Sequence, residues 1–200
     1  MIIGVTGGLG TGTSTAARCI ATSLKANLIV ADKIARSQVI KNADLLEQIV
    51  INFGKEILDI KGNIDRIKLA KKAFADKASH KKLCGILYPV IIAQISSIIK
   101  DINIYDFVVD APMLIESGFY KKCDELVVVS SSLSLQLERA WTKKGIANKD
   151  ALARIRLQMP LYKKARYADY IINNGAALTG LRKQCREIAD EFKNKKTRRR

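Results

Sequence analysis

The sequence contains a single histidine, His80, which lies in the basic segment KASHKK and is therefore expected to be exposed. A Ser-His-Asp or Cys-His catalytic centre would depend on this one residue, so the composition argues against both. The four cysteines lie far apart and form neither a C-x-x-C pair nor a cluster with histidine. This spacing does not match a zinc site, and we expect reduced thiols.

Long apolar runs are also lacking. The longest candidate, Ile86 to Ile99, is interrupted by Pro89, Gln94 and two serines, and it falls short of the roughly 20 residues that span a bilayer. Residues 1–6, MIIGVT, predict a strand that leads into glycines, whereas a signal peptide begins with basic residues and an apolar stretch. We therefore expect a cytoplasmic protein without a membrane span.

Acidic residues are scarce relative to basic ones. The 19 Asp and Glu residues against 35 Lys and Arg residues give a net charge of +16, which favours polyanionic partners such as nucleotides, CoA-like molecules or nucleic acid. Part of the excess lies in the C-terminal segment KNKKTRRR. Such charge blocks are typical of disordered tails that bind nucleic acid weakly and non-specifically.

The apolar pattern predicts alternating strands and helices. Strands are expected at residues 1–6, 26–30, 104–112, 125–131 and 170–172, and the uninterrupted apolar run Phe107 to Val109 indicates burial on both faces. A long helical stretch separates the second and third strands, with a turn at residues 61–63 and an interruption at Pro89. This order predicts an α/β doubly wound fold with a parallel sheet and helices on both of its faces.

Residues Gly7 to Ser14, GGLGTGTS, fit the pattern G-x-x-x-x-G-x-[ST] between a strand and a helix. In a phosphate-binding loop, glycines let backbone N–H groups converge on phosphate oxygens at the positive end of a helix. Ser14 would then ligate Mg²⁺ through its hydroxyl. A glycine-rich turn without a ligand is the alternative. The position usually held by lysine is Thr13, which cannot supply positive charge between the β- and γ-phosphates.

Two carboxylates follow predicted strands at the edge where ligands bind in open α/β sheets. Asp32 comes directly after the second strand, where a base for a substrate hydroxyl is expected, although it also suits a helix N-cap. Asp110 ends the third strand and is a candidate for the Mg²⁺ shell or an ordinary strand-ending turn. Further along, Arg139, Lys143 and Lys144 form either a solvated helix face or a phosphate clamp on a mobile lid.

These local patterns together resemble the dephospho-coenzyme A kinase family over roughly residues 1–185. TGGLGTGTST is similar to the family's TGG-x-G-SGKST opening, and VADKIAR is similar to its Asp-containing motif after the second strand. The segments ILDIKGNIDRIKLAKKAF, FVVDAPMLIESG and ARIRLQMPLYKKARYADYIINNGA also resemble the family's, in the same order and spacing.

The resemblance implies a P-loop kinase fold, in which a doubly wound five-stranded parallel sheet carries a helical substrate-binding insertion and a lid. It implies a core at about residues 1–32, 101–132 and 165–193, a CoA-binding insertion at about 33–100, a lid at about 133–164 and a basic tail at 194–200. The implied reaction is transfer of the γ-phosphoryl group of ATP to the ribose 3′-hydroxyl of dephospho-CoA, which completes coenzyme A.

The resemblance also implies residue roles. Asp32 would accept or orient the 3′-hydroxyl, and Arg139 would come from the lid. Acceptor binding would involve Asp65, Arg66 and Pro89, with Mg²⁺ at Ser14 and Asp110. ATP would be bound by Gly10, Thr11, Gly12, Thr13, Ser14, Thr15, Asn174 and Gly175.

The chain departs from the family pattern at four positions. Besides Thr13, Tyr88 replaces a histidine, Lys143 replaces an arginine and Lys144 replaces an aspartate. Three hypotheses follow: an active kinase in which a lid cation partly replaces the missing charge, a weakened homologue that binds ATP or CoA-like ligands, and a nucleic-acid-binding protein. Retention of Ser14 with both sheet-edge carboxylates favours the first. No oligomeric state follows from the sequence.

Overall fold

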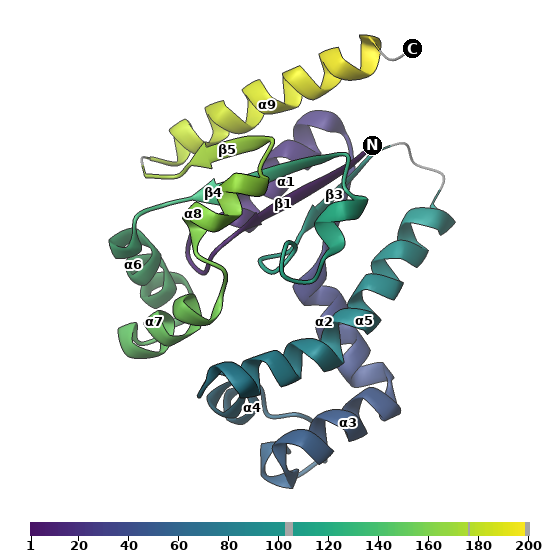
Figure 1. The fold of residues 1–200 in the computed structure, drawn as a ribbon, viewed down its shortest axis with the longest axis vertical. Helices are drawn as coiled ribbons and strands as arrows, with labels where there is room; N and C mark the ends of the chain where they lie inside the picture. Colours follow the sequence, from purple (N-terminus) through teal and green to yellow (C-terminus); the bar gives the residue numbers. More distant parts are fainter. Residues whose placement is uncertain (103–105, 176, 199–200) are drawn as a thin grey trace. The chain divides into compact units, whose positions relative to one another are not determined.

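The computed structural model describes residues 1–102, 106–175 and 177–198, apart from the side chains of Lys144, Lys196 and Arg198. The chain divides into two compact units. The first comprises Met1–Val30 with Ile102–Arg200, and the second comprises Ala31–Asp101. The sheet lies in the first unit and a set of helices forms the second (Figure 1).

The first unit is built on a five-stranded parallel sheet. Across the sheet the strands are β2 (Asn27–Val30), β3 (Phe107–Asp110), β1 (Ile2–Gly7), β4 (Glu125–Ser130) and β5 (Tyr170–Asn173). The register pairs Asp110 of β3 with Val5 of β1 and with Val30 of β2, so these strands end at one edge. The expected α/β doubly wound fold is confirmed. The predicted start of the third strand at residues 104 and 105 lies outside the described residues.

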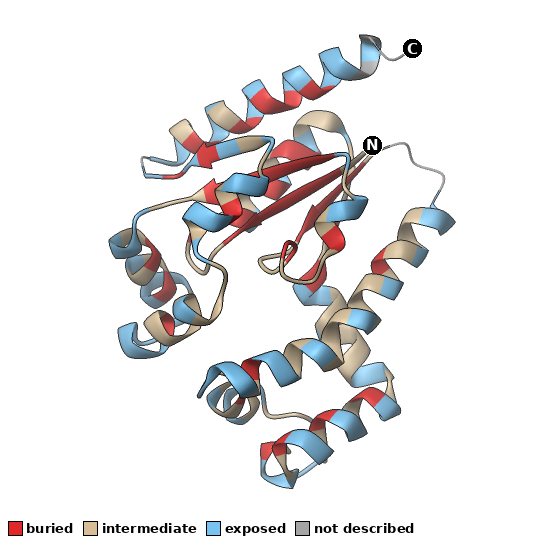
Figure 2. Cartoon of the chain, viewed as in Figure 1, coloured by how far each residue is buried: buried red, intermediate tan, exposed pale blue. Residues whose placement is uncertain are grey.

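Two helices cover one face of the sheet, α1 (Thr13–Leu24) and α9 (Leu178–Arg198). Alternate residues of β1 and β4 point to this face because side chains alternate along a strand. They pack against the small residues Ala16 and Ala17 of α1 and against the expected apolar stripe of α9: Leu181, Cys185, Ile188 and Phe192. Figure 2 shows that the central strands are almost entirely buried.

The opposite face is covered by the segment between β3 and β4. A Cβ atom at Gly4 would lie 2.9 Å from Cys123 Sγ and 3.1 Å from Leu114 Cδ2, so the glycine allows this segment to approach the sheet closely. The segment includes the 3₁₀ helix η2 (Phe119–Lys122). Between β4 and β5 the chain forms α6 (Leu133–Lys144), α7 (Asn148–Leu157), α8 (Leu161–Lys164) and the 3₁₀ helix η3 (Ala165–Tyr167).

The second unit is helical. It contains α2 (Ala31–Lys41), α3 (Ala43–Phe53), the 3₁₀ helix η1 (Lys55–Ile57), α4 (Arg66–Ala73) and α5 (Lys77–Asp101). Its own small core gathers residues spaced along α3 with one residue each from η1 and α4: Leu45, Ile49, Phe53, Ile57 and Ala73. A single bridge between Leu58 and Ile64 closes the turn that was expected at residues 61–63.

Helix α5 differs from the expectation, because Pro89 lies inside it and does not interrupt it. Proline removes one backbone hydrogen bond from a helix, but α5 also packs against α2, α3 and α4, which hold it in place. Among the described residues, α5 is the one helix whose length and composition would allow it to cross a membrane. Length and composition alone are weak evidence for a span, since helices of folded units pass the same test.

Two further expectations need correction. His80, which was expected to be exposed, is 9% exposed, and its ring lies 5.5 Å from that of Phe74. The basic C-terminal segment was expected to be disordered, but α9 continues through Arg198. Lys195 is anchored there, because its ammonium lies 2.7 Å from Glu125 Oε1.

Candidate active site

The phosphate loop connects β1 to α1 and takes a backbone conformation that requires glycine. Gly10 has φ 76° and Gly12 has φ 93°, both in the left-handed region. Space is also restricted, because a Cβ atom at Gly10 would lie 2.3 Å from the carbonyl oxygen of Gln136 in α6. A Cβ atom at Gly12 would lie 2.3 Å from Asn174 Nδ2. The loop leads directly into α1, so its backbone N–H groups lie at the positive end of that helix.

Thr13 is turned into the loop. Its side chain is 6% exposed, and its hydroxyl lies 3.0 Å from the hydroxyl of Thr11. Thr11 in turn donates to the carbonyl oxygen of Gly8 at 2.9 Å and accepts from the Gly8 N–H at 3.2 Å. Both threonine hydroxyls lie against Gly7, where an added Cβ atom would approach them to 2.6 and 2.7 Å. The two threonines therefore fill the inside of the loop with a hydrogen-bonded pair of neutral groups.

Asn174 and Arg139 connect distant segments to this loop. The Asn174 amide donates to the carbonyl oxygen of Thr11 at 2.7 Å, and Arg139 Nη1 donates to the carbonyl oxygen of Asn174 at 3.0 Å. Arg139 of α6 and the segment after β5 are thus joined to the phosphate loop through Asn174. Gly175, the next residue after Asn174, is exposed.

Ser14 and Thr15 occupy the first turn of α1, where the Ser14 side chain is exposed. Asp110 ends β3, the strand beside β1, and is 2% exposed. A serine hydroxyl and a carboxylate are oxygen ligands of the kind that Mg²⁺ prefers, and Mg²⁺ in kinases is typically held by one or two such groups with substrate phosphates. Among the described residues no group of three or more His, Cys, Asp or Glu forms a metal cluster of its own. Ser14 and Asp110 are therefore donors of a kind that fits Mg²⁺.

Asp32 lies in the first turn of α2, which begins one residue earlier at Ala31. A residue within the first turn is not the N-cap, so the capping alternative does not match the helix boundary. Because Val30 pairs with Asp110, β2 ends at the same edge as β3 and the chain enters α2 from there. The Asp32 side chain is exposed.

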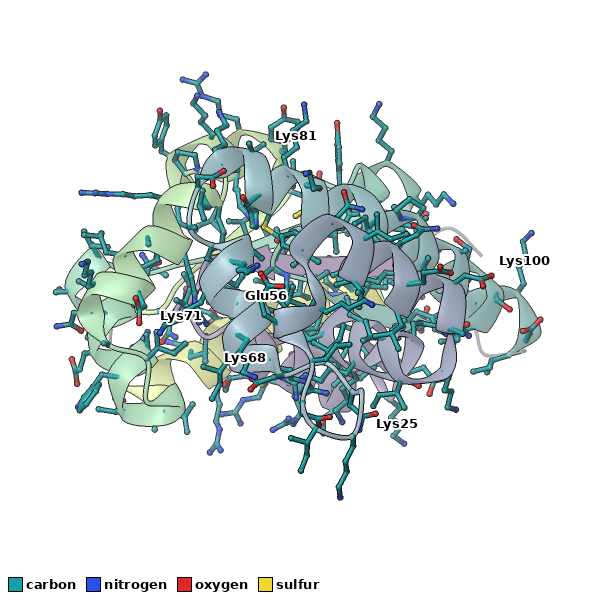
Figure 3. The ribbon with its side chains drawn as sticks, turned by 90° about the horizontal axis from the view of Figure 1, so that it is seen from below. Lys25, Glu56, Lys68, Lys71, Lys81 and Lys100 are labelled. Atoms are coloured by element: carbon teal, nitrogen blue, oxygen red, sulfur yellow. The ribbon has the colours of Figure 1, made fainter. Side chains whose placement is uncertain are left out.

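The candidate acceptor residues lie in the second unit. Asp65 is the N-cap of α4, where its carboxylate accepts from the N–H groups of Ile67 at 2.9 Å and Lys68 at 3.2 Å. Arg66 follows it and is exposed, as are Lys68 and Lys71 on the same helix (Figure 3). Pro89 lines a groove of about 530 Å³ whose walls come from α2 and α5: Gln38, Pro89, Val90, Ala93, Gln94 and Ser97. Pro89 and Asp65 therefore have different surroundings: Pro89 lines a groove, whereas Asp65 caps the start of a helix.

Comparison with known proteins identifies the family of the chain. The family model described as dephospho-CoA kinase matches residues 1–179. The dephospho-CoA kinase of Aquifex aeolicus (strain VF5) is 37% identical over 191 residues, which cover 95% of this chain and 96% of that protein. The chain belongs to the dephospho-CoA kinase family. It is therefore a transferase that phosphorylates an alcohol group, its substrates are ATP and dephospho-CoA, and its reaction is the last step of CoA biosynthesis.

Solved structures agree with this family assignment. The dephospho-CoA kinase from Campylobacter jejuni superposes with a TM-score of 0.64 at 30% identity, with 96% of each chain covered. TT1252 from Thermus thermophilus gives a TM-score of 0.77 at 24% identity and covers 96% of this chain and 97% of its own. Shikimate kinase from Acinetobacter baumannii, at a TM-score of 0.52 and 16% identity, covers 96% of this chain and 89% of its own. The latter two show a shared fold only.

Sequence reasoning looked for a replacement for the family's loop lysine at Lys143 and Lys144 of α6 and overlooked Lys164. Lys143 is exposed in the last turn of α6, and the side chain of Lys144 lies outside the described part. Lys164 of α8 is completely buried, and its ammonium donates to the carbonyl oxygen of Gly7 at 2.9 Å. Burial lowers the pKa of Lys164, and the carboxylate of Glu116 partly opposes this effect. In the sequence this lysine is one of several in a basic stretch, so no local signal marks it.

Proposed function

We propose that the chain transfers the γ-phosphoryl group of ATP to the ribose 3′-hydroxyl of dephospho-CoA, with the phosphates bound by residues 10–15. The phosphate loop is the observation that carries this proposal. Its glycines at positive φ and its position at the start of α1 suit the close approach of phosphate oxygens to backbone N–H groups. Asn174 and Gly175 would lie near the adenine.

Asp32 is the proposed base, because its side chain is exposed in the first turn of α2. It follows Val30 of β2 by two residues, and Val30 is the register partner of Asp110. An exposed carboxylate that is not occupied as a helix cap is available to accept the proton of the 3′-hydroxyl. Arg139 would stabilise the charge of the transferring phosphoryl group. It already reaches the loop region through the carbonyl of Asn174.

Mg²⁺ would be held by Ser14 and Asp110 together with the ATP phosphates, where it would neutralise charge on the phosphate oxygens. The exposed hydroxyl at the start of α1 and the carboxylate at the end of the neighbouring strand support this assignment. Because the lysine usual at position 13 is absent, Mg²⁺ and its ligands would have to neutralise more of the negative charge of the phosphates than in a standard loop.

The second unit would bind the acceptor. The groove beside Pro89 has apolar and amide-bearing walls, which suit an elongated molecule with amide groups. Arg66 is exposed and positively charged, which suits a phosphate group of the acceptor. Asp65 would contribute indirectly, because its carboxylate caps α4 and so fixes the position of Arg66.

The remaining proposals concern the roles of whole segments of the chain and the place where the protein acts. Residues 133–164 would act as the lid and residues 33–100 as the CoA-binding insertion beside a core of residues 1–32, 101–132 and 165–193. The protein would act in the cytoplasm. The basic tail at 194–200 would contact nucleic acid only non-specifically, through charge.

A coupled assay with ATP, Mg²⁺ and dephospho-CoA tests the proposal. Equal amounts of ADP and CoA are expected, and CoA offered as the acceptor is the control, because its 3′-hydroxyl is already phosphorylated. Thr13 motivates one alternative, a weakened homologue that binds nucleotide without efficient transfer. ATP binding without formation of ADP or CoA would replace the proposed activity with that alternative.

A further inference from the structure

A lysine that lies outside the predicted site contacts the first residue of the phosphate loop. Lys164 is the only lysine among the described side chains that is fully buried. Its ammonium donates to the carbonyl oxygens of Gly7, at 2.9 Å, and of Pro112, and it forms an ion pair with Glu116 Oε1 at 3.0 Å. A lysine ammonium has three N–H donors, so these three acceptors use all of them.

The three acceptors come from two different segments near the site. Gly7 ends β1 and begins the phosphate loop, whereas Pro112 and Glu116 follow β3, two and six residues after Asp110. The Pro112 carbonyl oxygen also accepts from the Thr6 hydroxyl at 2.9 Å, and Glu116 Oε1 also accepts from the Met159 N–H at 2.9 Å. Lys164 therefore joins the start of the loop to the segment that follows the proposed Mg²⁺ ligand.

The residues just before α8 hold the loop at a second point. Gln158 Oε1 accepts from the N–H of Leu9 at 3.0 Å. The stretch from Gln158 to Lys164 thus contacts the phosphate loop at Leu9 and at Gly7. Both contacts fix backbone groups of the loop, and neither occupies the inside of the loop, where Thr11 and Thr13 lie.

We propose that Lys164 is a positioning residue for phosphoryl transfer, which holds the carbonyl of Gly7 so that the loop N–H groups and Asp110 keep a fixed separation. This inference rests on the proposed function of the loop. The ammonium does not substitute for the missing loop lysine, because all of its N–H groups are already used and Glu116 balances its charge.

Stability alone is a weak explanation for this arrangement. Burying a charged pair carries a desolvation cost, and apolar side chains of similar size often replace such pairs without loss of stability. A directional contact to one loop carbonyl, by contrast, is something that an apolar side chain cannot supply. Rates of group transfer respond strongly to small displacements of the groups that hold the substrate.

The decisive variant is the double substitution Lys164→Met with Glu116→Gln, which removes both charges and leaves no buried ion unpaired. We expect ATP affinity to fall about tenfold and the single-turnover rate to fall about 10–100-fold, with the KM for dephospho-CoA unchanged. Lys163→Met with Glu187→Gln is the matched control, because both side chains are exposed and this pair of substitutions also leaves the net charge unchanged. A folded double variant with wild-type ATP affinity and rate would overturn the inference.

A measurement on the wild-type protein covers the case in which the double variant does not fold. Because Lys164 is fully buried, its ammonium protons should exchange slowly and give a persistent signal in ¹⁵N NMR. Adding ADP and Mg²⁺ should shift this signal, since a polyanion would bind to the loop that Lys164 supports, and an unshifted signal at saturation would contradict the inference. A wild type that makes no CoA would instead reject the proposed function, while ATP affinity would still test Lys164.

Discussion

Thr13→Lys restores the charged residue that a phosphate loop usually carries, and its effect can be worked out from the structure. A positive charge about 4 Å from a phosphate oxygen contributes about 4 kcal/mol at an effective dielectric constant of about 20. The substitution also removes the 3.0 Å contact between the hydroxyls of Thr13 and Thr11, which costs about 1 kcal/mol of stability but is lost equally in the ground and transition states. If about 3 kcal/mol of the attraction is expressed only in the transition state, the gain corresponds to about 10²-fold in rate.

The assay is single-turnover formation of CoA at saturating ATP and Mg²⁺, because product release then does not limit the observed rate. Thr13→Met is the matched control, since it introduces a long side chain of similar volume without the charge. We expect Thr13→Lys to be about 10²-fold faster than the wild type and Thr13→Met to be no faster. If Thr13→Lys is correctly folded but not accelerated, the wild-type loop does not lack charge at the transferring phosphoryl group.

Lys143 of α6 is a second candidate source of positive charge at the phosphates, and its substitution tests that role. Lys143 is exposed near the end of α6. Should it move to the phosphates during turnover, Lys143→Ala would slow the wild type strongly and Thr13→Lys would give little further gain. Should it remain in solvent, Lys143→Ala would leave the single-turnover rate unchanged. The double variant Thr13→Lys with Lys143→Ala shows directly whether the two charges replace each other.

Three further outcomes are expected. Asp32→Asn should leave ATP affinity unchanged and lower the transfer rate by about 10²–10⁴-fold, because it removes the proposed base; an unchanged rate would assign Asp32 another role. Deleting residues 196–200 should weaken polyanion binding in salt titrations without changing kcat, whereas a deletion that includes Lys195 would also break its ion pair with Glu125. Burial raises the pKa values of Cys123 and Cys185 to about 12, so mass spectrometry should find both unalkylated by iodoacetamide in the folded protein at neutral pH and modified after unfolding.

The fold was predictable from the sequence because the signals for it are local. Uninterrupted apolar runs marked β3 and β4, and the glycines of the phosphate loop marked the end of β1. The interruption expected at Pro89 was wrong, because the local effect of proline on a helix does not take account of the helices that pack against α5. The buried position of His80 was missed for a similar reason, since its lysine neighbours face solvent while its ring packs on Phe74.

The site was predictable only in part, because its contacts join residues that are far apart in the chain. The loop pattern predicted roles for the glycines and Ser14, and the strand ends predicted roles for Asp32 and Asp110, and these roles stay predictions. By contrast, the contact between Lys164 and Gly7 spans 157 positions. Nothing in a basic run distinguishes a buried lysine from a solvated one until the fold has brought these segments together.

The contacts that hold the backbone of the phosphate loop are independent of the residue that would supply its charge. Lys164, Gln158 and Asn174 hold the carbonyl of Gly7, the N–H of Leu9 and the carbonyl of Thr11, respectively. None of these contacts involves the side chain of Thr13. A loop that is already held at three backbone positions needs no side chain at position 13 to keep its shape, so loss of the lysine removes charge without removing order. For this reason Thr13→Lys should change the rate more than the affinity for ATP, whereas loss of Lys164 should change both.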